Sequence, residues 1–131
     1  MLVRCEKTCV FMLGGVVYGV CEILWRGYTH WTMVLLGGIC FLGLYLGQKK
    51  YAGLSVTMRC FAGGVFITSL ELAAGSVINV ALGMGVWDYS EMPLNFMGQI
   101  CPQFFGLWVI LCFPALLLCG GISRCFDKIY T

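Results

Sequence analysis

The sequence predicts an all-α membrane protein in which four transmembrane helices form two tandem helical hairpins, a parallel pseudo-repeat, within one integral membrane domain, residues 1–131. Composition is the first reason: 60% of the residues are hydrophobic, 11% are charged, and the mean hydropathy is +0.91. A soluble domain of this size could not bury that much apolar surface. The second reason is that four apolar runs are long enough to cross about 30 Å of hydrocarbon at about 1.5 Å per helical residue.

The four predicted spans lie near residues 8–26, 32–48, 59–83 and 98–122. Each must be helical, because isolated strands would leave backbone groups unpaired in lipid and the sequence lacks the alternation of a β-barrel. Small residues four apart favour close helix contacts in the first two spans, at Gly15 and Gly19 and at Gly43 and Gly47. In the fourth span, Pro102 and Pro114 remove backbone donors and can kink the helix.

The basic residues predict which side of the membrane each loop faces. Seven of the eight lie in the N-terminal tail, the middle loop or the C-terminal tail: Arg4, Lys7, Lys49, Lys50, Arg59, Arg124 and Lys128. Because basic loops stay in the cytoplasm, both termini are expected there, with loops 27–31 and 84–97 outside. Aromatic residues that favour the bilayer interface cluster at this outer boundary: Trp25, Tyr28, Trp31, Trp87 and Tyr89.

Two recurring phrases suggest an internal duplication. Gly14-Gly15-Val16 precedes Glu22, and Gly63-Gly64-Val65 precedes Glu71, each glutamate eight residues after the first glycine. The second and fourth spans share the phrases Gly37-Gly38-Ile39-Cys40 and Gly98-Gln99-Ile100-Cys101. Two hairpins that enter the membrane in the same direction would be related by an axis along the membrane normal, with the two glutamates facing each other at similar depth.

Glu71 is the most informative polar residue, because it lies near the centre of the third span, where an ionised carboxylate costs about 2.5–3.5 kcal/mol to insert. Helical spacing puts Gly64, Thr68, Gly75 and Asn79 in one narrow stripe with Glu71, and this stripe should face the bundle rather than lipid. The stripe is either a site for an ion, a proton or a substrate, or a hydrogen-bonded contact that holds helices together.

Charged residues also lie at the outer end of the first hairpin. Glu22 is one turn before Arg26, so an i, i+4 salt bridge is expected, with a role in a site as the alternative. His30, the only histidine, either carries protons beside Glu22 or Asp88 or acts as a hydrogen-bonding anchor at the interface.

Two glutamines stand at the outer end of the fourth span. Gln99 and Gln103 are one helical turn apart and can add amide donors to a polar chamber under loop 84–97. They can equally form hydrogen bonds between helices.

Several functional classes lack their motifs. The nine cysteines form no C-x-x-C pair and no cluster with metal-ligand spacing. No nucleophile elbow, phosphate loop or Cys/His dyad is present, so we expect no enzyme, no cofactor and no bound metal. A net charge of +2, scattered along the chain, argues against a nucleic-acid partner.

The outer loop and fourth span resemble a signature of bacterial membrane proteins known as the putative ABC-transporter type IV, or CmpB-like, family. The residues that carry it are Val86-Trp87-Asp88-Tyr89-Ser90, Pro93-Leu94-Asn95, Gly98-Gln99-Ile100-Cys101 and Trp108. Upstream, Glu22, Arg26-Gly27, His30-Trp31, Met33, Gly37-Gly38 and Phe41 look like the first half of the short, four-helix members. The resemblance implies a multi-pass protein of the bacterial cytoplasmic membrane and raises the expectation of a permease.

Two functions remain open. One is a small-solute or ion permease, expected to be a homodimer because four helices are few for enclosing a pathway, with an ATPase, if any, supplied as a separate protein. The other is a non-transporting assembly or regulatory subunit, whose Trp-Asp-Tyr-Ser loop contacts an extracytoplasmic partner. The candidate substrate- or ion-binding residues are Glu22, Arg26, His30, Thr68, Glu71, Asn79, Asp88, Asn95, Gln99 and Gln103.

Overall fold

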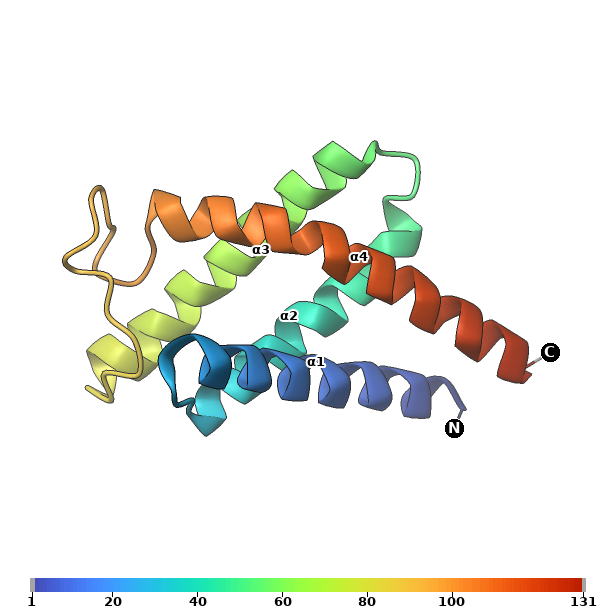
Figure 1. The fold of residues 1–131 in the computed structure, drawn as a ribbon, viewed down its shortest axis with the longest axis horizontal. Helices are drawn as coiled ribbons and strands as arrows, with labels where there is room; N and C mark the ends of the chain where they lie inside the picture. The colour runs from blue at the N-terminus through green and yellow to red at the C-terminus, as the bar shows by residue number, and fades with distance from the viewer. Residues whose placement is uncertain (1, 131) are drawn as a thin grey trace. The chain divides into compact units, whose positions relative to one another are not determined.

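The computed structural model describes residues 2–130 and contains four long helices (Figure 1). These are α1 (Leu2–Arg26), α2 (Trp31–Lys50), α3 (Val56–Gly75) and α4 (Pro102–Tyr130), with a π-helix, η1 (Ser76–Ala81), continuing α3. All four are long and apolar enough to cross a membrane when η1 is counted with α3. Residues 2–130 contain no named strand, and an isolated bridge pairs Phe96 with Ile100. The predicted all-α class with four apolar helices is confirmed.

The chain forms two compact units. The first consists of Met1–Leu54 with Pro114–Thr131, and the second of Ser55–Phe113. The first unit therefore holds α1, α2 and the C-terminal half of α4, and the second holds α3, η1, the loop 82–101 and the N-terminal half of α4. The boundary inside α4 falls at Pro114, whose ring removes a backbone donor from the helix. The single membrane domain and the symmetry between tandem hairpins stay predictions.

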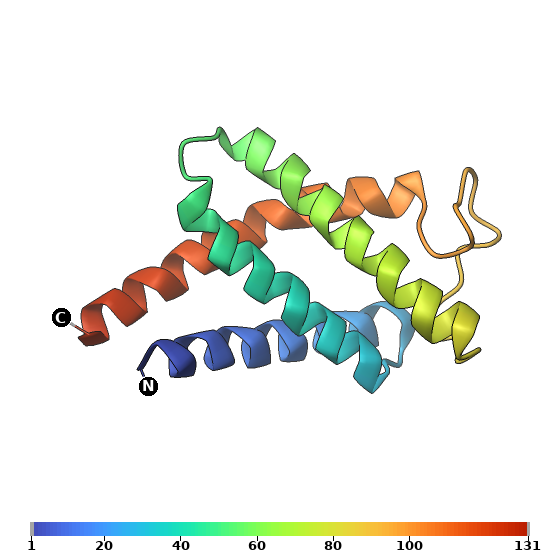
Figure 2. The same cartoon turned by 180° about the vertical axis from the view of Figure 1, so that it is seen from behind.

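In the first unit, α2 turns back along α1, and glycines let the two backbones approach closely (Figure 2). A Cβ on Gly15 would lie 2.7 Å from the carbonyl oxygen of Val34, and one on Gly38 would lie 2.8 Å from that of Phe11. A Cβ on Gly19 would lie 3.2 Å from Cγ2 of Val34. The close contact predicted for the first small-residue pair is therefore confirmed, because larger side chains would force the backbones apart.

Gly47, from the second small-residue pair, does not share this role. A Cβ on Gly47 would lie 3.8 Å from the ring of Tyr51, in the turn that ends α2. The α2 glycines that approach α1 are Gly37 and Gly38. On the α2 side, this contact is therefore formed by two neighbouring glycines.

Polar groups tie α2 to both other helices of the first unit. The hydroxyl of Tyr45 donates a hydrogen bond to the carboxylate of Glu6 on α1. The side-chain amide of Gln48 donates to the carbonyl oxygen of Cys119 on α4, at 3.4 Å. Tyr45 is buried, so its paired hydroxyl satisfies a polar group that lipid could not.

The start of α4 differs from the prediction. The helix begins at Pro102 rather than near residue 98, because Gly98 has a φ of +70° and Phe96 pairs with Ile100 in a tight turn. Proline is favoured in a first helical turn, where its missing N–H would have no helical partner. A kink within the span at Pro102 is therefore wrong, whereas Pro114 does lie inside the helix. The phrase Gly98–Cys101 is also not helical, unlike its proposed counterpart in α2.

The third span ends two residues earlier than predicted, at Ala81, and its last six residues are π-helical. Gly83, with a φ of +64°, follows and turns the chain into the loop. π-Helical turns are wider than α-helical ones and are frequent at functional sites. Asn79 lies in this segment and makes two of the contacts described below.

We expect Gly15→Ala to weaken the first unit by about 1–3 kcal/mol, because the new methyl group would overlap the backbone of α2. SDS-induced unfolding of the purified protein, followed by circular dichroism, measures this change. Gly121→Ala is the matched control, since a Cβ on this α4 glycine meets nothing within 4 Å. Equal stability of the Gly15 and Gly121 variants would show that the α1–α2 contact tolerates a wider spacing.

Candidate functional site

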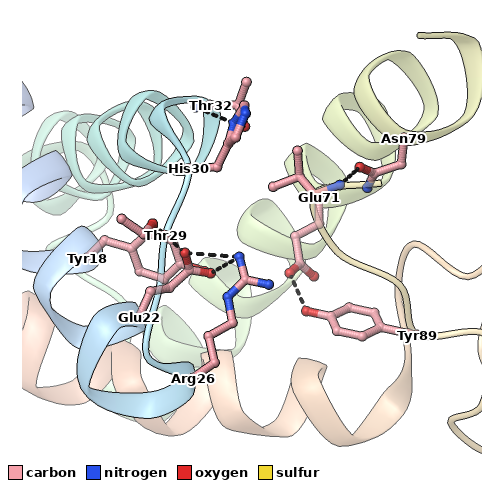
Figure 3. A network of polar contacts seen from close by, with 10 residues as sticks. Tyr18, Glu22, Arg26, Thr29, His30, Thr32, Glu71, Asn79 and Tyr89 are labelled. Carbon is pink, nitrogen blue, oxygen red and sulfur yellow. Dashed lines mark hydrogen bonds and ion pairs between the residues drawn. The ribbon is translucent and has the colours of Figure 1, made fainter. Parts of the chain in front are cut away.

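The carboxylate of Glu71 is the centre of the second unit's polar contacts. Glu71 lies on α3 and is 3% exposed. Its Oε1 accepts a hydrogen bond from the hydroxyl of Tyr89 at 3.0 Å (Figure 3), and its Oε2 accepts one from the indole N–H of Trp108 at 3.1 Å. The two donors come from the loop and from α4, so one carboxylate joins three elements of the unit. Both oxygens thus have a partner, as a buried polar group requires.

Aromatic rings hold these donors in place. The ring of Tyr89 stacks on that of Phe104, with centroids 4.6 Å apart and planes inclined by 17°. Phe104 in turn lies 6.2 Å from the ring of Trp108, one turn further along α4. The stacked rings restrict both donors and cover the carboxylate with apolar surface.

The stripe predicted around Glu71 faces the protein. Gly64, Glu71 and Gly75 are buried. A Cβ on Gly64 would collide with the side chain of Val109 on α4, so the absence of a side chain brings α4 close enough for its indole to reach Glu71. Thr68 lies one turn before Glu71, and its Oγ1 is buried without a hydrogen-bond partner in the part of the chain that the structure describes.

A second polar contact, between Asn79 and Gln99, anchors both ends of the loop. The side-chain amide of Asn79 donates to Oε1 of Gln99 at 2.8 Å, and its Oδ1 accepts from the backbone N–H of Val86 at 2.7 Å. The carbonyl oxygen of Gln99 accepts from the indole of Trp87 at 3.1 Å. A Cβ on Gly75 would lie 2.9 Å from the indole ring of Trp87 and 3.1 Å from Cβ of Gln99, so glycine leaves room for the loop to pack against α3.

Asn95 closes the loop on itself. Its Nδ2 donates to the carbonyl oxygens of Ser90 and Met92 at 3.1 and 2.9 Å, while its Oδ1 accepts from the N–H of Gly98 at 3.0 Å. The N–H of Tyr89 donates to the carbonyl oxygen of Gly98 at 2.7 Å. These four bonds make a compact turn whose geometry depends on one asparagine side chain.

Asp88 lies at the start of this turn and is exposed to solvent. Its Oδ1 accepts from the backbone N–H of Ser90 at 2.8 Å, and this bond holds the pKa of the exposed carboxyl below its usual range. Later in the loop, Leu94 and Met97 have left-handed φ angles of 59° and 55°. Such angles cost a non-glycine residue about 1–3 kcal/mol each and persist only where surrounding contacts impose them.

Glu22 serves the first unit in a different way. It forms the predicted salt bridge with Arg26, at 3.2 Å, which is thereby confirmed. Its Oε2 also accepts from the hydroxyl of Thr29 at 2.6 Å, and its Oε1 from that of Tyr18 at 3.5 Å (Figure 3). The carboxylate therefore fixes the turn between α1 and α2, next to Gly27, whose φ of +82° ends α1.

His30 is the N-cap of α2. Its Nδ1 accepts from the backbone N–H of Thr32 at 3.3 Å and lies 2.7 Å from the Thr32 hydroxyl. This arrangement matches the predicted alternative of a hydrogen-bonding anchor, because capping satisfies an otherwise unpaired helix donor.

Among the predicted site residues, the structure groups Glu71, Asn79 and Gln99 closely around the inner side of the loop, and Asp88 and Asn95 within it. Gln103 is exposed on α4 and is not one helical turn from Gln99, which precedes the helix. The prediction that the two glutamines share a chamber is therefore wrong.

Three aromatic residues have roles that were not predicted. Trp87, expected in the interfacial belt, is 6% exposed and hydrogen-bonded inside the unit. Tyr89 and Trp108 were not expected to bind Glu71. The only available signal was chemical: an indole N–H or phenol buried in an apolar span needs an acceptor, and Glu71 is the acidic residue of the neighbouring span.

Four apolar helices with a buried, hydrogen-bonded carboxylate define a multi-pass membrane protein. Over residues 6–129 the chain matches the family described as putative ABC-transporter type IV, and it belongs to that family. The resemblance found in the sequence is thus confirmed, and the protein is an ABC-transporter-related membrane protein. Comparison with curated proteins and with solved structures found no match.

Asn79→Ala should destabilise the second unit by about 1–3 kcal/mol, because it removes the side-chain hydrogen bonds that Asn79 makes with the N–H of Val86 and with Oε1 of Gln99. The free energy of unfolding in SDS tests this expectation. Ser69→Ala is the control, since Ser69 is exposed and its hydroxyl donates to the carbonyl oxygen of Val65 in its own helix. A loss no greater than that of the control would mean that the loop does not need this anchor.

Proposed function

We propose that this protein is a small-solute or ion permease in which Glu71 is the binding carboxylate. The observation that carries the proposal is that a buried acidic side chain inside a membrane-spanning helix has two hydrogen-bond donors, one of them on a loop. Ionisable residues within transmembrane segments are costly and commonly mark ion, proton or substrate paths.

The hydrogen-bond donors around Glu71 suit a carboxyl group that changes between its ionised and protonated states. An indole N–H can only donate, so Trp108 keeps Oε2 as an acceptor in either protonation state. A phenol hydroxyl can donate to a carboxylate or accept from a carboxylic acid, so Tyr89 can remain bonded to Oε1 in both states. A proton can thus be gained, lost or replaced by a cation without rebuilding the site.

The loop 82–101 is proposed to act as a lid over Glu71. Tyr89 is the loop residue that contacts the carboxylate, so movement of the loop would remove one donor and uncover Oε1. The buried, unpartnered hydroxyl of Thr68 offers a further oxygen ligand one turn away on the same helix. Carboxylate and hydroxyl oxygens together suit a small cation or a polar solute.

The remaining features of the proposal come from charge and size. We propose a bacterial cytoplasmic membrane protein with both termini in the cytoplasm, because the basic residues favour that orientation. Four helices argue for a homodimer, and an ATPase, if one drives transport, would be a separate protein that docks at residues 48–58, where Lys49 and Lys50 lie at the end of α2. The contacts of Glu71 support binding rather than catalysis, so no enzymatic activity is proposed.

A second candidate is a non-transporting assembly or regulatory subunit. The observation that favours it is that both oxygens of Glu71 are already paired, as in a contact that simply holds α3, α4 and the loop together. Under this alternative, Trp87 and Tyr89 would not reach an external partner, since both are engaged inside the unit. Contacts with another subunit would have to use other residues.

The decisive measurement is infrared titration of the Glu71 carboxyl in reconstituted protein, with Glu71→Gln to identify its band. A permease predicts that the titration midpoint changes when one member of a panel of Na⁺, K⁺, ammonium ions and small polar solutes is added. Glu91→Gln, at an exposed loop carboxylate, is the matched control and should leave that response intact. A band that ignores pH and every solute would support the assembly subunit instead.

Tyr89→Phe tests the lid contact separately. Loss of the hydroxyl removes a hydrogen bond to a carboxylate, worth about 1.5–3 kcal/mol, so affinity for the responding solute should change at least about tenfold. The C=O stretch of protonated Glu71 should also move to higher frequency. Tyr51→Phe, at an exposed tyrosine beyond α2, should do neither. Identical spectra for both variants would remove Tyr89 from the site.

A further inference from the structure

The apolar tip of the loop, formed by Leu94, Phe96 and Met97, is exposed in a way that the site does not explain. The exposed fractions of these side chains are 86%, 56% and 55%. Leu94 and Met97 carry the loop's two left-handed φ angles outside glycine. Because two residues adopt costly backbone angles while large apolar side chains stay exposed, we expect another surface to cover these side chains.

The tip is held rigidly in this exposed position. Asn95 stands between the two strained residues, and its three hydrogen bonds fix the backbone on both sides. Tyr89 and Gln99 then fasten the ends of the same turn to Glu71 and Asn79. The display of apolar groups is therefore built into the folded loop.

The position of the loop in the chain identifies the covering surface. Residues 82–101 join the end of one membrane-spanning element, at Ala81, to the start of another, at Pro102 (Figure 1). The ends of two spans meet the bilayer surface, so the tip lies next to the boundary between headgroups and acyl chains. Apolar exposure continues on both flanks, at Leu82 after η1 and at Ile110 on α4. Exposed apolar side chains thus lie on either side of the tip in the chain as well as at the tip itself.

The charges of the loop indicate what kind of lipid contact this is. Asp88 and Glu91 are exposed, and residues 82–101 contain no lysine or arginine. Attraction to anionic headgroups therefore cannot hold the loop at the membrane. Insertion of apolar side chains can, since it depends on area removed from water and not on headgroup charge.

We propose that Leu94, Phe96 and Met97 insert into the interfacial layer of the leaflet at their own end of the spans, and so anchor the α3–α4 loop to the bilayer. This inference goes beyond the proposed transport function and holds whether Glu71 binds a solute or joins helices.

The test uses the full chain with Leu94→Cys, labelled with an environment-sensitive fluorescent maleimide and reconstituted in zwitterionic vesicles. Glu91→Cys, three residues earlier in the same loop, is the matched control, and labelled wild-type protein supplies the background of the native cysteines. We expect the Leu94→Cys probe to emit at shorter wavelength and to be quenched by lipids carrying a shallow nitroxide. The Glu91→Cys probe should instead be quenched by aqueous iodide.

Two further arms make the result specific. Vesicles with anionic lipid should leave the Leu94→Cys quenching unchanged, because the contact is apolar. Adding Asn95→Ala should reduce nitroxide quenching, because it releases the turn that displays the tip. A probe at residue 94 that behaves like the probe at 91 would overturn the proposal. A probe shielded from both quenchers would overturn it in favour of a protein partner or a second copy of the chain.

Discussion

The second unit depends on one constraint: a carboxylate buried in a membrane-spanning helix must find its hydrogen-bond donors inside the protein. The donors to Glu71 lie on α4 and on the loop, so the positions of both elements depend on α3. Gly64 and Gly75 follow from this, because each removes the side chain that would keep a donor-bearing segment away. The glycines and the glutamate therefore share one face of α3 for one reason: the buried carboxylate needs donors from neighbouring segments, and the glycines let those segments come close.

The two glutamates of the recurring sequence phrase differ in their chemistry. Each accepts a hydroxyl hydrogen bond from the segment that follows its helix, from Thr29 for Glu22 and from Tyr89 for Glu71. Glu22, however, has Arg26 as a salt-bridge partner, whereas the ion pair recorded in residues 2–130 does not involve Glu71. The charge of Glu22 is neutralised by Arg26, so this carboxylate serves to hold the turn between α1 and α2. Where a carboxylate is only hydrogen-bonded, protonation or cation binding remains available, which is why the proposed function rests on Glu71.

Hydropathy and periodicity predicted the parts of the structure that are local in the chain. The four apolar helices, the inward face around Glu71 and the Glu22–Arg26 pair all follow from spacings within one helix. The loop could not be predicted this way, because its bonds join residues such as Asn79 and Gln99, 20 positions apart, through irregular backbone. Gly98–Cys101 looked helical because it is apolar enough for a span, yet a positive φ at Gly98 decides otherwise. Trp87 was misplaced for the same reason: its indole partner is a backbone carbonyl that no pattern reveals.

The hydrogen bonds of the loop fall into two sets, and the division has mechanical consequences. The bonds of Asn95 lie wholly within the loop and would survive its displacement. The side-chain hydrogen bonds that hold the loop to α3 and η1 join Tyr89 to Glu71, and Val86 and Gln99 to Asn79. Breaking the second set would release a preformed turn, with glycines in left-handed conformations at its first residues to absorb the rotation. If the loop acts as the proposed lid, it would uncover Glu71 without unfolding, and an apolar tip inserted in the bilayer would limit its movement. The site and the tip are therefore mechanically linked through one short segment, although each can be tested alone.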